Sequence, residues 1–456
     1  MDTKKLRQKI LDLAIHGKLV PQDPNDEPAS VLLERIRKEK EQLIKEGKIK
    51  APKKSKTSSD MSHYPKEGPW KLPNGWVWSY LGEISDYGKC ITVPVSAIND
   101  DEWVLELEDI EKDTGRLVKQ IAKRERSING SRHAFSEDQV LFSKLRTYLN
   151  KVLVAPSNGY CTTEIIPISP QSGVLPEYLN LVLRSPYFLD YTAQCGYGVK
   201  MPRLGTSDAI KALIPIPPHE EQRRIVESVG IYSDIIELIQ SEKERLAKYV
   251  SNCKSVILDL AIHGKLVPQD PNDEPAIELL KRINPDFKPS DNLHYEGTLP
   301  VGWSLCRLED ILEYEQPQAY IVKSTDYSEK YETPVLTPGK SFILGHTNES
   351  DGICNTLPVI IFDDFTTESK YVDFPFKVKS SAMKILRVKG EIDIRYVTFF
   401  MSITRLTGDT HKRYWISEYS KLCIPLPPLQ EQKRIVAKIV ELNEQLDRLS
   451  ADIQRD

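Results

Sequence analysis

Residues 10–29 read ILDLAIHGKLVPQDPNDEPA, and residues 257–276 repeat the same string letter for letter. Two unrelated helices of a globular protein have no physical reason to agree at every position, including the polar ones. The sequence therefore predicts that the chain arose by internal duplication, and that the repeated string belongs to a shared helical scaffold.

A second repeat follows a different spacing. Residues 214–226 read IPIPPHEEQRRIV, and residues 424–436 read IPLPPLQEQKRIV. When both repeats are aligned, the last residue of the chain falls on Leu246 and the first falls on Lys248, which are almost adjacent. We therefore expect a duplicated, circularly arranged protein that is cut open inside one copy of its repeat. The segments between the repeats are unlike each other.

The central repeat predicts one long helix over Glu220–Gly264. Pro217 and Pro218 precede it, and Gly264 is placed as a C-terminal cap. At 1.5 Å per residue such a helix is roughly 60 Å long. Its apolar residues recur in steps of three and four, the heptad pattern of a coiled-coil seam. The predicted seam of this helix consists of Ile225, Val229, Tyr232, Ile236, Ile239, Leu246, Val250, Ile257 and Leu260.

The same heptad pattern continues at both chain ends. In the C-terminal helix it comprises Ile435, Ile439, Leu442, Leu446 and Leu449. In the N-terminal helix it comprises Leu6, Ile10 and Leu13. We expect these two helices to form a broken, antiparallel partner of the central helix, with the inserts at opposite ends about a pseudo-two-fold axis. The alternative is that they are ordinary amphipathic helices on separate domains.

The two inserts open on similar phrases and then diverge. LPNGWVWSYLGEI opens the first, and LPVGWSLCRLEDI opens the second. Runs such as QVLFSKLR, KVLVAP, IIPISP, PVIIF and FPFKV predict strands, and PEYLNLVLRS and IRYVTFFMSI predict short helices. The predicted fold class is therefore α/β (α+β), with two globular inserts separated by two long antiparallel coiled-coil helices and an internal pseudo-two-fold duplication.

This reading divides the chain into five regions. Lys48–Met61 is rich in lysine and serine and predicts a linker, with a shorter counterpart at Asn284–Leu293. The predicted regions are an N-terminal helical region (1–50), a first insert (51–215), a central region with the long helix (216–290), a second insert (291–424) and a C-terminal helix (425–456).

The composition is that of a soluble globular protein. The 456 residues are 40% hydrophobic with a mean hydropathy of −0.40, and no apolar run is long enough to cross a membrane. The seven cysteines form no CxxC pair, which favours reduced thiols in a cytoplasm over disulfides or a zinc site. Because the net charge is −4, a nucleic-acid-binding face must be a local basic patch.

At this point the chain resembles the specificity (S) subunits of type I restriction–modification enzymes over nearly its whole length. The resemblance lies in the PPxxEQxRIV helix starts at Pro217–Val226 and Pro427–Val436, the PxGW openings, and two unlike inserts between like helical spacers. The first insert also carries SKLRTYLNKV and CTTEI, which are similar to phrases of the target-recognition domains in that family.

The resemblance implies a function for each part. The inserts would be target-recognition domains that each read half of a bipartite, asymmetric site in double-stranded DNA, and the paired helices would set the distance between the half-sites. Two methyltransferase (M) subunits and two restriction (R) subunits would be the partners. Adenine methylation with S-adenosylmethionine, and restriction with ATP and magnesium, would belong to those partners. This chain would be a non-catalytic, DNA-binding subunit of a restriction system in the cytoplasm.

Basic and aromatic side chains in the inserts are the candidate DNA contacts, because Lys and Arg bind phosphates and forked donors read base edges. In the first insert the candidates are Lys123, Arg124, Arg126, Lys144, Arg146, Tyr148, Lys151, Tyr197, Lys200 and Arg203. In the second insert they are Lys370, Tyr371, His411, Lys412, Arg413 and Tyr414. For any single residue the alternative is a solvated surface charge.

The sequence offers little catalytic chemistry of its own. It lacks GxxxxGK[ST], and Asn284-Pro285-Asp286-Phe287 is a poor match to a methyltransferase motif. We expect no catalytic residues, no metal ligands and no cofactor bound by this chain. One rival hypothesis is a metal-dependent nuclease built on Asp363, Asp364 and Glu368–Lys370. Another is a scaffold or a DNA-mimic inhibitor, which the acidic net charge would suit.

Overall fold

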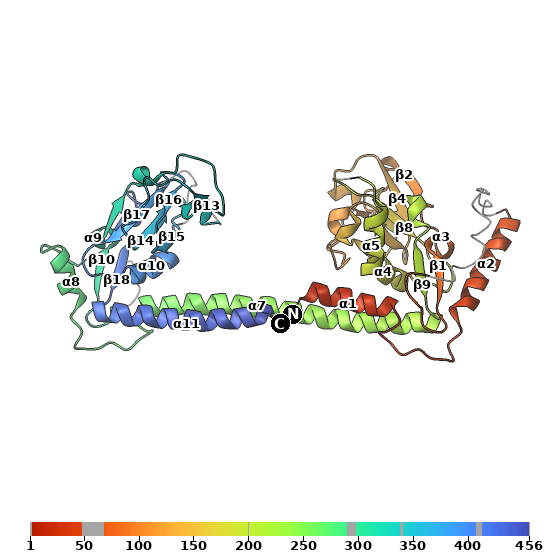
Figure 1. The fold of residues 1–456 in the computed structure, drawn as a ribbon, viewed down its shortest axis with the longest axis horizontal. Helices are drawn as coiled ribbons and strands as arrows, with labels where there is room; N and C mark the ends of the chain where they lie inside the picture. Colours follow the sequence, from red (N-terminus) through yellow and green to blue (C-terminus); the bar gives the residue numbers. More distant parts are fainter. Residues whose placement is uncertain are drawn as a thin grey trace. The chain divides into compact units, whose positions relative to one another are not determined.

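The computed structural model describes residues 2–47, 68–198, 200–289, 298–337, 341–406 and 413–455. Contacts within the chain divide it into two compact units, Met1–Glu242 and Lys243–Asp456. Each unit contains one insert together with parts of the repeated helices, as Figure 1 shows. The predicted linker at Lys48–Met61 and residues 290–293 of its counterpart lie outside the described residues. The five-region division remains a prediction.

The long central helix is present. It is α7, which spans His219–Ile262 and directly follows Pro217 and Pro218. Its C-terminal cap is Gly264, whose φ of 63° is left-handed and therefore favourable for glycine. The backbone N–H of Lys265 bonds the carbonyl of Leu260 at 2.8 Å, which satisfies one of the last helical carbonyls. The prediction of a single helix from the repeat was correct to within two residues at each end.

In unit 1 the N-terminal helix packs on the first part of α7. Helix α1 (Thr3–Ile15) begins at Asp2, whose carboxylate accepts hydrogen bonds from the backbone N–H groups of Lys4 and Lys5. The residues that α1 and α7 bury in one common core are Ile10, Leu11, Ala14, Ile15, Ile225, Val229 and Ile236. A second helix, α2 (Ala29–Lys45), follows the repeated string.

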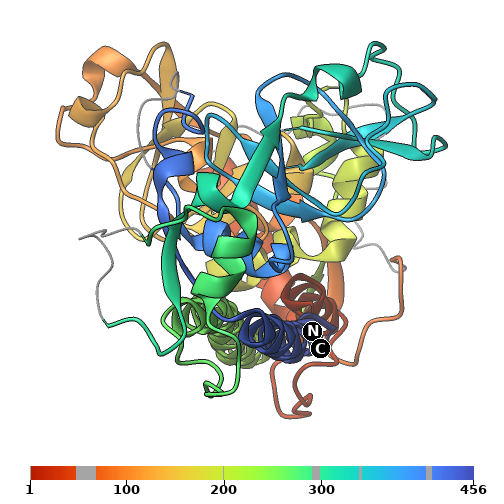
Figure 2. The same cartoon turned by 90° about the vertical axis from the view of Figure 1, so that its left-hand side faces the viewer.

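In unit 2 the C-terminal helix takes the corresponding place. Helix α11 (Leu429–Arg455) lies beside the second part of α7, and the views in Figures 1 and 2 agree on this. Ile435 and Ile439 are buried in one core with Ala261, and the Lys254 ammonium pairs with the Asp447 carboxylate at 2.6 Å. The short helix α8 (Ala276–Ile283) follows the second copy of the repeated string.

The predicted seam is buried over only part of its length. Its buried members are Ile225, Val229, Ile236, Val250, Ile435 and Ile439. Its half-buried members are Ile239, Ile257, Leu260, Leu442 and Leu446. Tyr232, Leu246 and Leu449 are exposed, so these three do not pack in a core. The heptad pattern identified the helices, but the burial of each position depends on what covers it.

Within the described residues, each insert contains three small sheets. In unit 1 the four-stranded sheet has the order β2 (Ile91–Pro94), β4 (Ser131–Phe135), β7 (Gly159–Thr162) and β3 (Val104–Leu105). The three-stranded sheet has the order β6 (Val152–Val154), β5 (Val140–Ser143) and β8 (Ile165–Ile168). Helices α4 (Pro176–Arg184), α5 (Pro186–Cys195) and the one-turn α6 (Thr206–Ala209) follow these strands in the chain.

Unit 2 has sheets of the same sizes. Its four-stranded sheet has the order β11 (Leu312–Glu315), β17 (Met383–Val388), β14 (Val359–Asp363) and β15 (Ser369–Val372). Its three-stranded sheet has the order β13 (Ile343–Thr347), β12 (Thr333–Leu336) and β16 (Lys377–Val378). Helix α10 (Ile394–Ile403) follows these strands. In neither unit does the described part of the chain contain a helix long and apolar enough to cross a membrane.

A two-stranded ribbon closes each insert. In unit 1, β1 (Val77–Tyr80) pairs antiparallel with β9 (Leu213–Ile216), and the one-turn helix α3 (Leu81–Ile84) follows β1. In unit 2, β10 (Ser304–Arg307) pairs with β18 (Cys423–Leu426), and the one-turn helix α9 (Leu308–Ile311) follows β10. The strand that directly follows each PxGW motif thus pairs with the strand of the IPxPP segment that leads into a long helix. This pairing explains why both motifs recur.

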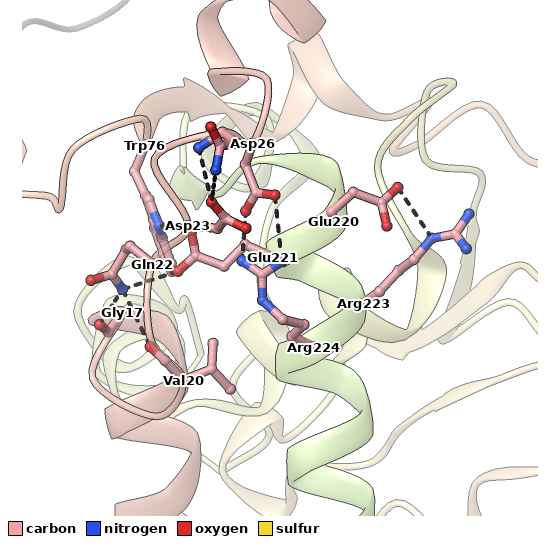
Figure 3. Close-up of polar contacts among 11 residues, drawn as sticks. Gly17, Val20, Gln22, Asp23, Asp26, Trp76, Glu220, Glu221, Arg223 and Arg224 are labelled. Atoms are coloured by element: carbon pink, nitrogen blue, oxygen red, sulfur yellow. Dashed lines mark hydrogen bonds and ion pairs between the residues drawn. The ribbon is translucent and has the colours of Figure 1, made fainter.

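The repeated polar residues meet at the start of α7 in unit 1 (Figure 3). The Glu221 side chain belongs to a residue only 1% exposed. Its carboxylate accepts a hydrogen bond from Trp76 Nε1 at 2.9 Å and another from Gln22 Nε2 at 3.0 Å. Arg224 pairs with Asp26 at 2.5 Å in the same place. The string GKLVPQDPND, the PxGW opening and the EQxR helix start are therefore joined by one polar cluster.

Unit 2 contains the same cluster in its own copy of the motifs. Glu431 accepts hydrogen bonds from Trp303 Nε1 at 3.0 Å and from Gln269 Nε2 at 3.0 Å. Arg434 pairs with Asp273 at 2.6 Å. Because every partner of the buried carboxylate lies in a repeated motif, the repeats are explained by the need to fasten each insert to its helix.

Candidate nucleic-acid interface

In unit 1, the turn between β5 and β6 carries several of the predicted basic residues. Strand β5 is buried along its whole length, so the chain that leaves it is anchored in the core. The turn contains a one-turn 3-10 helix, Thr147–Leu149, flanked by Arg146 and Asn150, both in the left-handed region with φ of 49° and 52°. The buried Asn150 donates from Nδ2 to the carbonyl of Arg184 at 3.1 Å, which ties the turn to α4.

A second loop, after α5, lies against this turn. The backbone N–H of Arg146 bonds the carbonyl of Pro202 at 2.8 Å, and that of Leu204 bonds the carbonyl of Lys144 at 2.9 Å. Tyr197 and Arg203 bond each other through their backbones at both ends of this loop. The structure therefore brings together two predicted basic clusters that lie far apart in the sequence.

Several side chains of these two loops face solvent. Tyr148 is 58% exposed and Tyr197 is 60% exposed, and Arg146 and Lys200 are also exposed. We call the surface formed by Arg146, Tyr148, Tyr197 and Lys200 the loop patch. It combines a guanidinium and an ammonium with two aromatic rings, groups that suit phosphates, base edges and base faces.

Arg203 and Lys144 support the loop patch. The Arg203 guanidinium donates through Nε and Nη2 to the two carboxylate oxygens of Glu164 at 3.2 and 3.1 Å. These hydrogen bonds raise the pKa of the Arg203 guanidinium above its ordinary value. The Arg203 guanidinium therefore stabilises its own loop. Lys144, beside it, is half-buried. The pairing with Glu164 could not be predicted from the sequence, because Glu164 lies in the turn between β7 and β8.

The basic residues upstream of the turn are used within the protein. Lys123 pairs with Asp100 at 3.1 Å and donates to the carbonyl of Ile98 at 2.6 Å. Arg124 is exposed and pairs with Asp101. Lys123 is half-buried and Arg124 is exposed, and each is paired with an aspartate.

Arg126 and Lys151 are engaged by groups within unit 1, and Arg126 corrects the sequence-based prediction. The Arg126 side chain is 9% exposed and pairs with Asp109, which is fully buried. Lys151 donates to the carbonyl of Leu107 at 2.6 Å, and desolvation lowers the pKa of its ammonium. Arg126 is therefore not available for DNA, whereas the half-buried Lys151 is engaged within unit 1 and its DNA contact stays a prediction.

The turn between β14 and β15 is the counterpart in unit 2. Its left-handed residue is Thr367, with φ of 57°, whose hydroxyl accepts a hydrogen bond from the backbone N–H of Leu406 at 3.2 Å. The backbone N–H of Tyr414 bonds the carbonyl of Asp364 at 3.0 Å, and that of Trp415 bonds the Asp364 carboxylate at 2.8 Å. As in unit 1, a hairpin turn is held against a loop that follows a helix.

The side chains on the β14–β15 turn and its neighbouring loop differ from those of the loop patch. The Lys370 ammonium lies 4.4 Å from the centroid of the Phe342 ring, and Arg395 lies 5.1 Å from that of Tyr371. Arg413 is exposed and lies 6.0 Å from the centroid of the Phe365 ring. His411 and Lys412 lie outside the described residues.

Tyr414, like Arg126, corrects the predicted set of DNA contacts. The residue is only 4% exposed and belongs to the core of unit 2. A buried ring cannot reach a base or a phosphate without unfolding its surroundings. The sequence run of basic and aromatic residues did not distinguish this core position from its exposed neighbour Arg413.

The nuclease-like pattern of the second insert is engaged in local contacts. The Asp363 carboxylate accepts hydrogen bonds from the backbone N–H of Phe365 at 3.1 Å and from the Thr366 hydroxyl at 2.5 Å. Glu368 pairs with Arg405 at 3.2 Å. Asp364 is buried and pairs with Lys384 at 3.4 Å. These carboxylates shape the hairpin turn, which is the role that the contacts explain.

Comparison with a family model identifies part of the chain. The model described as "Type I restriction modification DNA specificity domain" matches residues 300–454. These residues cover most of the second insert and nearly all of α11.

Two curated relatives come from Escherichia coli. The type I restriction enzyme EcoEI specificity subunit is 31% identical over 377 residues, which cover 68% of this chain and 62% of that protein. The type I restriction enzyme EcoAI specificity subunit is 32% identical over 389 residues, which cover 70% of this chain and 64% of that protein. The chain thus spans a little under two thirds of the length of these relatives.

A solved structure shares the fold. It is described as "Structural basis underlying complex assembly and conformational transition of the type I R-M system" and aligns with a TM-score of 0.57 at 20% identity. The alignment covers 85% of this chain and 96% of that one.

Proposed function

The chain belongs to the family of type I restriction–modification specificity subunits, and on that premise we propose that it selects the DNA sequence on which its partner subunits act. Each unit would read one half of a bipartite site. Because the two inserts are unlike, the two half-sites would differ, and the whole site would be asymmetric.

One observation carries this proposal. Both inserts hold a hairpin turn against a following loop by backbone hydrogen bonds, but they place different side chains on that frame. Unit 1 exposes Arg146 and Tyr148, whereas unit 2 has Phe365 and Arg413 at its turn and loop. Two surfaces that recognise two different short sequences require the same arrangement of turn and loop with different side chains on it.

The partners follow from the family and from the duplication. We propose that two methyltransferase subunits bind, since the helical scaffold offers each repeated motif twice. Two restriction subunits would join the complex. S-adenosylmethionine, ATP and magnesium would act in those partners, and this chain would be non-catalytic.

The repeated helices would set the distance between the half-sites. We propose that α7 and its shorter partner helices form an antiparallel coiled coil with a pseudo-two-fold axis. Half-sites read from one face of B-DNA lie about one helical turn apart, or roughly 34 Å. The 44 residues of α7 are long enough to span such a distance.

Selection from a random library tests this function. The purified complex of the full chain with its methyltransferase partner would be mixed with duplexes of random sequence, and the bound duplexes would be sequenced. We expect two short defined blocks separated by an undefined spacer of fixed length. Affinity should fall steeply as salt rises, because phosphate contacts release counterions.

Each other outcome contradicts the proposal. If the complex enriches no sequence, the chain is not the specificity determinant. If the isolated chain cleaves DNA with a metal ion and Glu368→Ala abolishes the cleavage, the nuclease hypothesis is favoured. If the complex binds no duplex and the chain instead blocks a restriction enzyme, the inhibitor hypothesis is favoured.

A further inference from the structure

Arg146 has an unusual backbone for an arginine. Its φ of 49° lies in the left-handed region, where the Cβ atom is crowded and glycine or asparagine is the ordinary choice. Asn150, the other left-handed residue of the turn, fits that preference and is buried. An arginine at the first position is not needed to make the turn, since glycine would adopt the same backbone without strain.

The surroundings hold this backbone in place. The Arg146 N–H bonds the carbonyl of Pro202 at 2.8 Å, and the Arg146 carbonyl accepts from the N–H of Leu149 at 2.9 Å. Thr147, the next residue, is buried. The turn is therefore rigid, and it keeps the Arg146 side chain on the exposed side of the loop patch.

The Arg146 guanidinium is available to bind a ligand. Within the residues that the structure describes, no hydrogen bond or ion pair engages the Arg146 side chain. Arg203, on the loop that pairs with this turn, is held by both oxygens of Glu164. The same loop pair thus contains one arginine fixed by the protein and one presented to solvent from a fixed backbone.

We propose that Arg146 reads a guanine through the major groove in the half-site recognised by unit 1. The planar guanidinium presents two parallel N–H donors that match O6 and N7 of guanine. A backbone fixed before binding reduces the entropy lost when the fork is aligned. Tyr148 and Tyr197 supply apolar edges beside it, and Lys200 neutralises a phosphate. This assignment rests on the proposed function.

The contrast with unit 2 limits the effect to one half-site. The left-handed residue of the β14–β15 turn is Thr367, which is buried and bonded through its hydroxyl to Leu406. That turn presents no arginine at the corresponding place. Changing Arg146 should therefore alter one position of one half-site and leave the other half-site unchanged.

The test is library selection by the complex of the full chain with its methyltransferase partner, repeated with Arg146→Ala, Arg146→Gly and Lys200→Ala. We expect the wild type to require guanine at one position that both Arg146 variants accept as any base. Affinity for the guanine-containing site should fall about 10- to 100-fold in these variants, with little change for sites that lack the guanine. Arg146→Gly relieves the left-handed backbone, so this variant separates loss of reading from loss of folding.

Lys200→Ala provides the contrast. It should weaken all sequences alike and lower the slope of log affinity against log salt by about one. The assignment is overturned if the Arg146 variants weaken all sequences equally, which would indicate a phosphate contact, or if they change nothing. A wild-type complex that selects no two-part site would instead refute the proposed function itself.

Discussion

Removing Ser241–Glu244 from α7 should shorten the undefined spacer of the recognised site and leave both half-sites unchanged. Four helical residues account for about 6 Å of length and a little more than one turn. Since B-DNA rises about 3.4 Å per base pair, the expected change is about two base pairs. Methylation at the original spacing should fall at least about tenfold, and a site with a shorter spacer should replace it. The measurement is the methylated motif of the complex that contains the deletion.

The matched control keeps the length of α7 and changes its side chains. Replacing the same four residues by alanine preserves the helix, because alanine has the highest helix propensity. This variant should methylate the original motif. The spacing role of α7 would be refuted if the deletion changed the half-site sequences, or if it methylated sites with the original spacer as well as before.

Replacing the buried carboxylate of unit 1 should have the largest effect on stability. Glu221→Ala leaves the buried Trp76 N–H without its acceptor, removes one of the hydrogen bonds of the Gln22 amide, and opens a cavity at the start of α7. One unsatisfied buried donor costs about 1–3 kcal/mol and the cavity adds to this, so we expect a loss of about 3 kcal/mol. Hydrogen exchange of backbone amides in β1 and the first turns of α7 should then quicken about 100-fold.

The neighbouring glutamate is a matched control for this variant. The Glu220 side chain is 60% exposed and lies 3.8 Å from Arg223, so Glu220→Ala should change exchange little. Glu431→Ala should destabilise unit 2 in the same manner, because Glu431 has the same donors in its own unit. Equal exchange rates in Glu221→Ala and Glu220→Ala would show that the buried cluster does not fasten the insert.

The same carboxylate gives a pH signature. Burial raises the pKa of Glu221, while the hydrogen bonds from Gln22 and Trp76 partly oppose this. Because the pKa of Glu221 is higher in the folded state than its unfolded-state value of 4.5, the protonated carboxyl stabilises the fold below pH 4.5. This contribution is lost as the pH rises through the folded-state pKa. The wild type should therefore lose stability relative to the non-titrating Glu221→Gln over that interval, as measured by denaturant unfolding.

Much of the fold could be predicted because its signals are local or repeated. The prolines before α7, the glycine after it and its heptad pattern set the helix bounds. The apolar runs predicted β5, β6, β8, β14 and β16. Strand β4 was missed, because SRHAF is polar at several positions and its pairing with β2 and β7 is set by distant residues. The exposed seam residue Tyr232 shows that periodicity does not determine what covers a helix.

The candidate site was predictable in its residue types and not in their use. Arg124 and Arg126 stand two positions apart, yet Arg124 is exposed and Arg126 is paired with the fully buried Asp109. The decisive partner of Arg203 is Glu164, which is distant in the sequence. In the sequence these residues form only a cluster of cations. Tertiary pairing decides which of them are free to bind a ligand.

The measurement that tests the central claim most directly is a map of N6-methyladenine in a host that has no adenine methylation of its own. The host would express the methyltransferase partner with and without this chain, and single-molecule sequencing would locate the modified bases. We predict a bipartite, asymmetric motif that appears only when the chain is present. A soluble complex that adds no methylation, or the same motif in the absence of the chain, would contradict the account.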